Sequence, residues 1–299
     1  MSKLAQAPAR AEPAGPRVAP PLRVGLATLR ATYIIWYRDV LRFWRDRWRL
    51  VFSLVQPLLY LLIFGTGLSS SLRGAAGAFG GRGSTLSYQQ FIYPGIICMS
   101  VLFSAIFGAM SIVWDREFGF LKEILVAPIN RAAVAVGKTL GSATQSMVQG
   151  LILLVLAPFV GVSLSWQAVL GLVPLVFVLA FGLSAGGVAL GARMRSMQGF
   201  QVVMNFLMMP MFFLSGALFA LRGLPGWMSV LTRLDPAAYG VDPIRKVVLS
   251  GAGVPGPVLD RLGLDWNGHV LSIGFEVLVM LVFGLVMLGI AIFNFQQRD

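Results

Sequence analysis

Few side chains in this 299-residue sequence are of the types that carry out catalysis or hold metals. The single cysteine, Cys98, and the single histidine, His269, exclude an internal disulfide framework and leave almost nothing for a zinc site. The sequence holds no His-Glu-x-x-His motif, no Gly-x-Ser-x-Gly elbow and no pair of carboxylates within an apolar segment. An enzyme embedded in a membrane is therefore not indicated, and we expect no metal site.

One short stretch resembles a phosphate-binding loop. Ala132–Thr139 reads Ala-Ala-Val-Ala-Val-Gly-Lys-Thr, which matches a relaxed pattern with Ala in place of the first Gly. A phosphate loop needs a preceding strand and several free backbone amides, whereas this stretch is apolar and poor in glycine. We therefore expect that the chain binds neither ATP nor another cofactor, and that Lys138 is an anchor whose ammonium reaches the membrane interface.

An ionisable side chain within an apolar segment is a candidate for function, and Glu276 is such a residue. It lies about seven residues, or about 10 Å, inside the last apolar segment of the chain. At that depth it could couple transport to an ion or a proton, form a structural hydrogen bond or line an outer cavity.

A second candidate group lies in the apolar segment 202–221, where methionine and phenylalanine cluster. Flexible thioethers and aromatic rings form an adaptable surface that suits a hydrophobic substrate, although ordinary helix packing also produces such clusters. A buried amide such as that of Asn205 joins helices or touches substrate. The candidate residues of a translocation path are therefore Asn205, Met208, Phe212 and Glu276.

The segments that carry these residues have the composition of a membrane protein. Hydrophobic residues make up 57% of the chain and charged residues 12%, and the mean hydropathy is +0.79. A hydrocarbon core of about 30 Å needs about 20 apolar residues per helix. Six stretches qualify: Leu50–Leu68, Phe91–Val113, Leu140–Val162, Ala168–Leu190, Val202–Leu221 and Val270–Phe293. Because lipid leaves backbone amides unsatisfied unless they pair internally, we predict an all-α polytopic membrane protein with six transmembrane helices over residues 50–297.

The Lys and Arg residues predict how these helices face. With both termini in the cytoplasm, 17 of the 24 Lys and Arg residues fall in cytoplasmic segments and 7 in outer ones. The positive-inside rule therefore places both termini in the cytoplasm, and it accounts for most of the net charge of +12 without nucleic acid. Residues 1–22 are rich in Ala and Pro, lack the apolar core of a signal peptide and are predicted to be a disordered cytoplasmic tail.

Residues 23–49 form an amphipathic segment. Its apolar stripe recurs at three- and four-residue steps and consists of Leu26, Leu29, Tyr33, Tyr37, Val40, Trp44 and Trp48. The opposite stripe carries Arg38, Arg42, Arg45 and Arg49, with Asp39 and Asp46 among them. We predict an interfacial helix on the cytoplasmic leaflet. It serves either as a simple anchor or as an elbow helix that also borders a partner subunit or the entry route of a substrate.

The predicted cytoplasmic stretch 114–131 and the predicted outer segment 222–269 connect the spans. The first combines exposed apolar residues with mixed charges and ends at Pro128, so it is either an ordinary connector or a short helix that docks in a groove of a soluble partner. In the second, Asp-Pro pairs resemble N-caps and predict short outer helices at about 226–234 and 243–250, with an irregular tail over 251–268.

Three passages resemble the membrane subunits of type-2 ATP-binding-cassette (ABC) transporters, the exporter class that includes drug-resistance, nodulation-factor and polysaccharide permeases. Residues 115–128 with Arg131 are similar to the cytoplasmic passage after the second span of that family. Residues 214–227 are similar to its exit from span five, and residues 234–245 to its outer passage with Asn/Asp-Pro, Tyr, Asp and Arg. The resemblance covers roughly residues 25–297.

The resemblance implies a cytoplasmic coupling helix at about 116–127, gripped by a separate nucleotide-binding subunit that holds ATP and Mg²⁺. The implied contact positions are Glu117, Phe118, Gly119, Leu121 and Glu123. It further implies two ATPases and two permeases, as a homodimer or a homologous heterodimer, in the lipid of the cytoplasmic (inner) membrane. Because the chain ends soon after the last span, we expect no fused ATPase domain.

Two classes of function remain. The leading hypothesis is an export permease, not itself an enzyme, that moves a drug-like, amphiphilic or lipid-linked substrate with power from the ATPase subunit. The hydrophobic surface of the fifth span favours a drug or small amphiphile as the substrate over a lipid-linked glycan. The alternative is an ion- or proton-coupled secondary transporter that uses Glu276.

Overall fold

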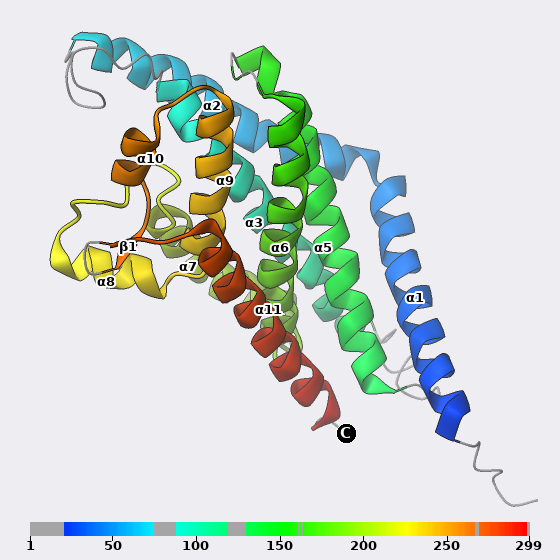
Figure 1. Ribbon diagram of the computed structural model, residues 1–299. Helices are drawn as coiled ribbons and strands as arrows, with labels where there is room; N and C mark the ends of the chain where they lie inside the picture. The colour runs from blue at the N-terminus through cyan, green and yellow to red at the C-terminus, as the bar shows by residue number, and fades with distance from the viewer. Residues whose placement is uncertain are drawn as a thin grey trace, which may run out of the picture.

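The computed structural model describes residues 21–74, 88–118, 130–160, 162, 164–266 and 269–297, and these are nearly all helical (Figure 1). The helices are α1 (Pro21–Arg45), α2 (Arg47–Gly74), α3 (Tyr88–Glu117), α5 (Arg131–Val155), α6 (Trp166–Gly191), α7 (Met197–Leu214), α8 (Gly226–Leu234), α9 (Ala238–Gly251), α10 (Gly256–Leu262) and α11 (Ile273–Gln296). A 3₁₀ turn, η1 (Ala157–Val160), follows α5. Two short antiparallel strands, β1 (Asp265–Trp266) and β2 (His269–Val270), pair Asp265 with Val270.

Several of these helices have the length and apolarity of membrane spans. Within the described residues, α3, α6, α7 and α11 meet this requirement individually. A fifth candidate combines Leu26–Arg45 with Leu50–Gly65, which are bent by 71° relative to each other. The prediction of a polytopic helical membrane protein is thus supported, while the count of six spans is not confirmed.

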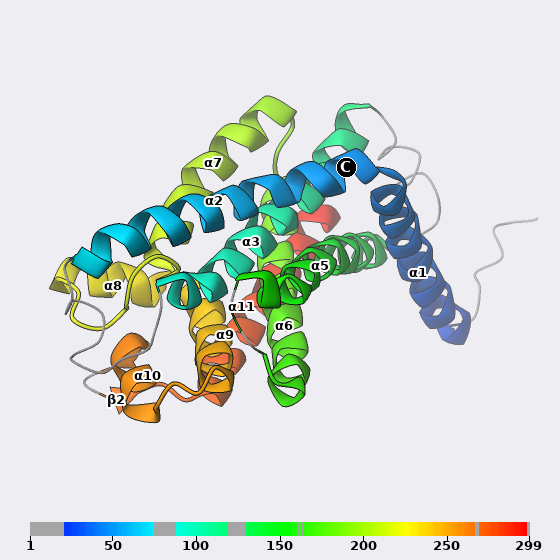
Figure 2. The ribbon, with the colours of Figure 1, turned by 90° about the horizontal axis from the view of Figure 1, so that it is seen from above.

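Helix α3 forms the centre of the core. Of its most apolar 18 residues, 83% are buried, because α2, α5, α6, α7 and α9 all pack around it. Seen from above, α3 lies between α2 on one side and α6, α9 and α11 on the other (Figure 2). Small residues allow these close contacts: a side chain at Gly108 would collide with Ser142 of α5, and one at Gly187 with Ala109 of α3.

Helix α5, the predicted third span, is less apolar than α3, α6, α7 and α11 for a structural reason. Its polar side chains face inward and include Lys138, Ser142, Gln145, Ser146 and Gln149, all of them buried. The Ser142 hydroxyl donates to the carbonyl of Ala105 at 2.8 Å, and the Gln149 amide donates to the carbonyl of Ser53 at 2.9 Å. Polar groups therefore join α5 to its neighbours, where an apolar solvent would make hydrogen bonds between helices favourable.

Helix α1 lies along the first half of α5 and runs in the same direction, with Ile35 against Gly137 and Asp39 against Gly141. The predicted apolar stripe is largely exposed on the other side of α1, as expected for a face toward lipid: Leu26, Leu29, Tyr33, Tyr37 and Trp44 are each more than half exposed. The predicted arginine stripe differs from expectation, because Arg38 and Arg42 turn toward α3 and form ion pairs with Asp115.

The region between α7 and α11 is more ordered than predicted. Helix α8 has the predicted bounds, 226–234, but α9 begins at Ala238 and contains Pro243. The prediction that Asp242 caps this helix was wrong, because the Asp242 carboxylate instead accepts a hydrogen bond from the backbone of Leu264 at 2.8 Å. Helix α9 packs against α3, α6 and α11, and most of its residues are buried (Figure 1).

The predicted irregular tail over 251–268 was also wrong for its described part. Residues Gly256–Leu262 form α10, which Pro257 favours at the start because proline is compatible with the first helical turn. The β1–β2 pair then returns the chain to the start of α11. This region therefore positions side chains of α9 against α11.

Candidate functional site

The end of α3 connects four other helices through consecutive residues. Asp115 pairs with α1 and α5, as described below. The Arg116 guanidinium donates to the carbonyl of Ala192 at 2.9 Å and to that of Met194, both at the turn between α6 and α7. The Glu117 carboxylate accepts a hydrogen bond from the backbone of Met197 at 3.3 Å, at the start of α7. The last residues of α3 therefore hold the ends of the helices around them.

A buried ion cluster, here called the α1–α3–α5 cluster, consists of Asp39, Asp115, Lys138, Arg38 and Arg42. The Lys138 ammonium lies 3.0 Å from the Asp39 carboxylate and 2.6 Å from that of Asp115. Lys138 is 1% exposed, so the prediction that its ammonium reaches the membrane interface was wrong. Burying an ammonium group is unfavourable unless carboxylates compensate the loss of water, and two carboxylates lie beside Lys138 here.

The two arginines complete this cluster from its rim. The Arg38 guanidinium lies 2.8 Å from the Asp115 carboxylate, and the Arg42 guanidinium lies 3.8 Å from the same carboxylate. The Arg42 guanidinium also lies over the ring of Trp114, 5.6 Å from its centroid. The cluster contains three cationic side chains and two carboxylates, so it carries an excess of positive charge.

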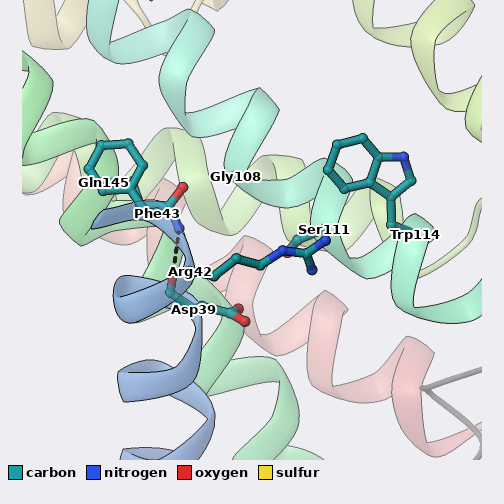
Figure 3. Close-up of a pocket in the computed structure, with 7 residues that line it drawn as sticks. All are labelled: Asp39, Arg42, Phe43, Gly108, Ser111, Trp114 and Gln145. Carbon is teal, nitrogen blue, oxygen red and sulfur yellow. Dashed lines mark hydrogen bonds between the residues drawn. The ribbon is translucent and has the colours of Figure 1, made fainter. Parts of the chain in front are cut away.

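A small cavity of about 10 Å³ adjoins the cluster (Figure 3). In the close-up, Asp39 and Arg42 from α1 face Ser111 and Trp114 from α3, while the Gln145 amide donates to the carbonyl of Asp39 at 3.4 Å. A volume of this size holds about one water molecule and no larger ligand. The cluster is therefore a joint between helices rather than a substrate pocket.

The start of α5 is held in a similar way. Asn130 caps the helix by accepting a hydrogen bond from the backbone of Ala132 at 3.0 Å. The Arg131 guanidinium donates to the carbonyl of Gln296 at 3.1 Å, at the end of α11. The phosphate-loop-like stretch Ala132–Thr139 is continuous helix in α5, which begins at Arg131, nine residues before the predicted start of the third span.

The predicted coupling positions extend from the end of α3 into the segment that precedes α5. Glu117 and Phe118 are described, and the Phe118 side chain is 74% exposed. Gly119, Leu121 and Glu123 lie outside the described residues. Residues on both sides of the segment 119–129 thus form hydrogen bonds with the C-terminal ends of α6 and α11 and with the start of α7.

A second buried ion cluster, here called the α9–α11 cluster, contains Glu276. The Lys246 ammonium lies 2.9 Å from the Asp242 carboxylate and 2.8 Å from that of Glu276, and both carboxylates are fully buried. Because α11 begins at Ile273, Glu276 lies in its first turn and not seven residues inside a span.

The charges of α9, which is not among the candidate spans, perturb one another. Burial acts to raise the pKa of the Asp242 carboxyl, but its interaction with Glu276 and the charges of Lys246 and Arg245 bring that pKa below its usual value. Arg245 is itself 1% exposed, donates to the carbonyl of Gly216 and lies over the ring of Phe91, 4.7 Å from its centroid.

The candidate path residues are not gathered at one place. Asn205 is exposed, whereas Met208 and Phe212 are buried, and the ring of Phe212 meets that of Tyr60 edge-on at 6.4 Å. Glu276 contacts Lys246 of α9 and does not join them.

An apolar cavity of about 530 Å³ lies on another side of α7. Helices α3, α6, α7 and α11 line it, and so does the segment from the end of α8 to Pro236. Two methionines of the predicted cluster, Met204 and Met211, are among its lining residues. A cavity of this size accommodates a drug-sized molecule.

Sequence reasoning missed Asp39, Asp115 and Arg245 as buried charges. Asp39 was predicted to lie among the arginines of the polar stripe, but it follows the buried Ile35 by four residues and precedes the buried Phe43 by four, a spacing that places it on their side of α1. The apolar residues that adjoin Asp115 and Arg245 were a weaker indication of burial, since either charged residue could equally lie at a helix end in water.

Comparisons with known proteins agree with this architecture. Residues 30–249 match the family model of the ABC-2 type transporter. The chain is 26% identical over 239 residues to the ycf38 transport permease of Cyanophora paradoxa, covering 79% of each chain. It is 29% identical over 228 residues to the inner membrane transport permease YadH of Escherichia coli K12, covering 74% of this chain and 84% of YadH. It is 26% identical over 226 residues to nodulation protein J of Rhizobium leguminosarum bv. viciae, covering 75% and 82%. The chain is therefore a membrane component of the ABC-2 type transporter family, a family of transport permeases.

Proposed function

We propose that this chain is the permease subunit of an ABC exporter that moves a drug-like, amphiphilic or lipid-linked substrate out across the cytoplasmic (inner) membrane. A separate nucleotide-binding subunit binds ATP and Mg²⁺, and two permeases, identical or homologous, form one transporter. Both termini lie in the cytoplasm. The chain contributes no catalytic residue to ATP hydrolysis.

The observation that carries this proposal is the anchoring on both flanks of the segment 119–129. A partner that pushes on this segment pushes on Arg116 and Glu117, which hold the turn between α6 and α7. It also pushes on Arg131, which holds the end of α11. Packed helices move as rigid bodies, so a local push becomes a displacement of whole helices.

The α1–α3–α5 cluster extends this linkage to the N-terminal helix. Asp115 lies two residues before Glu117, and its carboxylate pairs with Lys138 and Arg38. Helices α1, α3 and α5 are therefore tied together next to the segment that the ATPase would grip. The exposed Phe118 supplies an apolar contact beyond the end of this joint.

The alternative of an ion-coupled secondary transporter finds less support. Its candidate residue, Glu276, is already paired with Lys246 at 2.8 Å, which accounts for a buried carboxylate at this position without a transported ion. If ion coupling were the mechanism, Glu276→Gln would abolish transport, whereas ATP depletion with the ion gradient held would not.

The proposal is tested by co-expression with the ATPase subunit and reversal of charge at the coupling positions. We expect Glu117→Lys with Glu123→Lys to abolish ATP-dependent transport in vesicles, because like charges would replace attraction at the subunit contact. Glu117→Gln retains the acceptor for the Met197 backbone and separates loss of docking from loss of the anchor at α7. Asp260→Lys, on the exposed surface of α10, is the matched control and should transport normally. Normal transport by the double variant would refute the coupling assignment.

A further inference from the structure

The apolar cavity beside α7 contains one ionisable group among its lining residues. Its wall is made of aliphatic, methionine and aromatic side chains, including Leu102, Ile106, Leu183, Met204, Met211 and Phe283. Asp235, in the loop between α8 and α9, is the exception. Burying a carboxyl group in the wall of an apolar cavity is unfavourable unless another interaction compensates it.

The Asp235 carboxyl is only half satisfied by the described part of the chain. It is 6% exposed, and one oxygen accepts a hydrogen bond from the backbone of Ala237 at 2.9 Å. The other oxygen is buried and has no hydrogen-bond partner among the described residues. Burial raises the pKa of Asp235 to about 7, with the Ala237 amide acting in the opposite direction.

The nearest cation along the chain does not complete this group. Arg233 lies 3.9 Å from the Asp265 carboxylate, and its guanidinium lies over the ring of Trp266, 5.9 Å from the centroid. No Lys, Arg or His lines the cavity in the described ranges. The unpartnered oxygen of Asp235 has almost no accessible surface in this structure. A ligand that brought its own positive charge would therefore supply the interaction that the protein leaves out once the Asp235 side chain turns toward the cavity.

We propose that this cavity binds lipophilic organic cations, with an apolar body among the α3, α6, α7 and α11 side chains and a protonated amine against Asp235. This inference deepens the proposed function, on which it rests, by naming the substrate class of the exporter. The volume of about 530 Å³ suits a drug-sized amine. Methionine side chains adapt to different apolar bodies, and the Phe283 ring offers a surface to a cation.

Other occupants would leave the carboxyl uncompensated. A lipid acyl chain would fill the apolar part but give Asp235 no partner. A second permease copy could cover the exposed residues of α7, such as Phe206 and Met209, but it would then close the cavity to ligands. These two occupants are distinguishable outcomes of the following experiment.

The probe pair is desipramine, a secondary amine with a tricyclic apolar body, and N-acetyl desipramine, its neutral amide. Binding of each is measured on the permease–ATPase complex in nanodiscs without nucleotide. We expect the wild-type complex to bind the amine about tenfold more tightly than the amide, since hydrogen bonds to charged groups are stronger than neutral ones. Asp235→Asn should abolish this difference while it preserves the acceptor for Ala237.

Two further variants make the result specific to the cavity. Gly186→Val adds volume at the wall, where a side chain would meet only Phe283 at 3.6 Å, and should weaken both probes. Asp260→Asn removes an exposed carboxylate away from the cavity and should change neither.

Three results would overturn the inference. The first is equal affinity of the two probes, which indicates an apolar or lipid groove only, and the second is an unchanged amine preference in Asp235→Asn. The third is crosslinking between copies of the variants Phe206→Cys or Met209→Cys that excludes the amine. Binding is measured without ATP, so its failure is independent of the proposed function. If binding holds but ATP drives no transport of any probe, the exporter function fails instead.

Discussion

The two buried ion clusters share one design and differ in how completely it is satisfied. In each, a lysine bridges two carboxylates: Lys138 between α1 and α3, and Lys246 between Asp242 and Glu276. The α1–α3–α5 cluster adds two arginines and joins three helices that are distant in sequence. The α9–α11 cluster joins two helices and leaves one oxygen of each carboxylate without a hydrogen-bond partner among the described residues.

This difference indicates two mechanical roles. In the α1–α3–α5 cluster each carboxylate has at least two cationic partners, so the cluster is costly to open, because any separation leaves a charge uncompensated in a buried site. It therefore suits the end of α3, where the proposed push from the ATPase must be transmitted without loss. At the other cluster, incompletely satisfied carboxylates allow proton uptake or rearrangement at lower cost.

The largest effect should come from Lys138→Met. Removal of the lysine leaves Asp39 and Asp115 buried with only the rim arginines, so we expect a loss of about 3–5 kcal/mol in the free energy of unfolding. The measurement is unfolding of the purified permease in mixed detergent micelles. Adding Asp39→Asn and Asp115→Asn should restore part of the loss, because the buried charges are then gone; no restoration would mean that packing, not charge, explains the effect.

Lys246→Met should have a smaller effect, about 1–3 kcal/mol in the same measurement. Lys246 is 12% exposed, its partner Asp242 keeps the hydrogen bond from Leu264, and one carboxylate can bind a proton to relieve repulsion. Lys246→Met with Glu276→Gln is the matched control and should be more stable than the single variant. A loss equal to that of Lys138→Met would remove the distinction between the two clusters.

The amino-acid sequence was informative about the elements of this molecule and much less about its charges. Apolar length located the stretches that contain α3, α6 and α11, because a stretch of about 20 apolar residues has few other stable states in lipid. The predicted span Val202–Leu221 was displaced relative to α7, which begins at Met197 and ends at Leu214. Helix α8 had the predicted bounds, while Pro243 was misread as a helix start, since proline is compatible both with the first turn and with a packed helix interior.

The buried charges near the predicted coupling positions could not be assembled from the sequence. That Glu117 and Phe118 form a cytoplasmic contact stays a prediction; the structure places them at the end of α3, beside the segment 119–129. The pairing of Asp39, Asp115 and Lys138 could not be predicted, because it depends on which faces of α1, α3 and α5 meet. Periodicity identifies a face of one helix but not its partner.

The smallest predicted effect is the change in stability over one pH unit at the Asp235 carboxyl, which lies between α8 and α9 and has one oxygen without a partner among the described residues. The pKa of Asp235 is raised to about 7, above its unfolded value, so the folded state binds a proton more tightly than the unfolded chain. Its contribution to stability is complete below the unfolded pKa and is lost as pH rises through about 7, at most about 1.4 kcal/mol per pH unit. The charged neighbour on α8, Arg233, is engaged by Asp265 and should not reverse this sign. We expect the Tm of the permease to fall between pH 5 and about 8, and Asp235→Asn to remove that part of the slope; an unchanged slope would place the titrating group elsewhere.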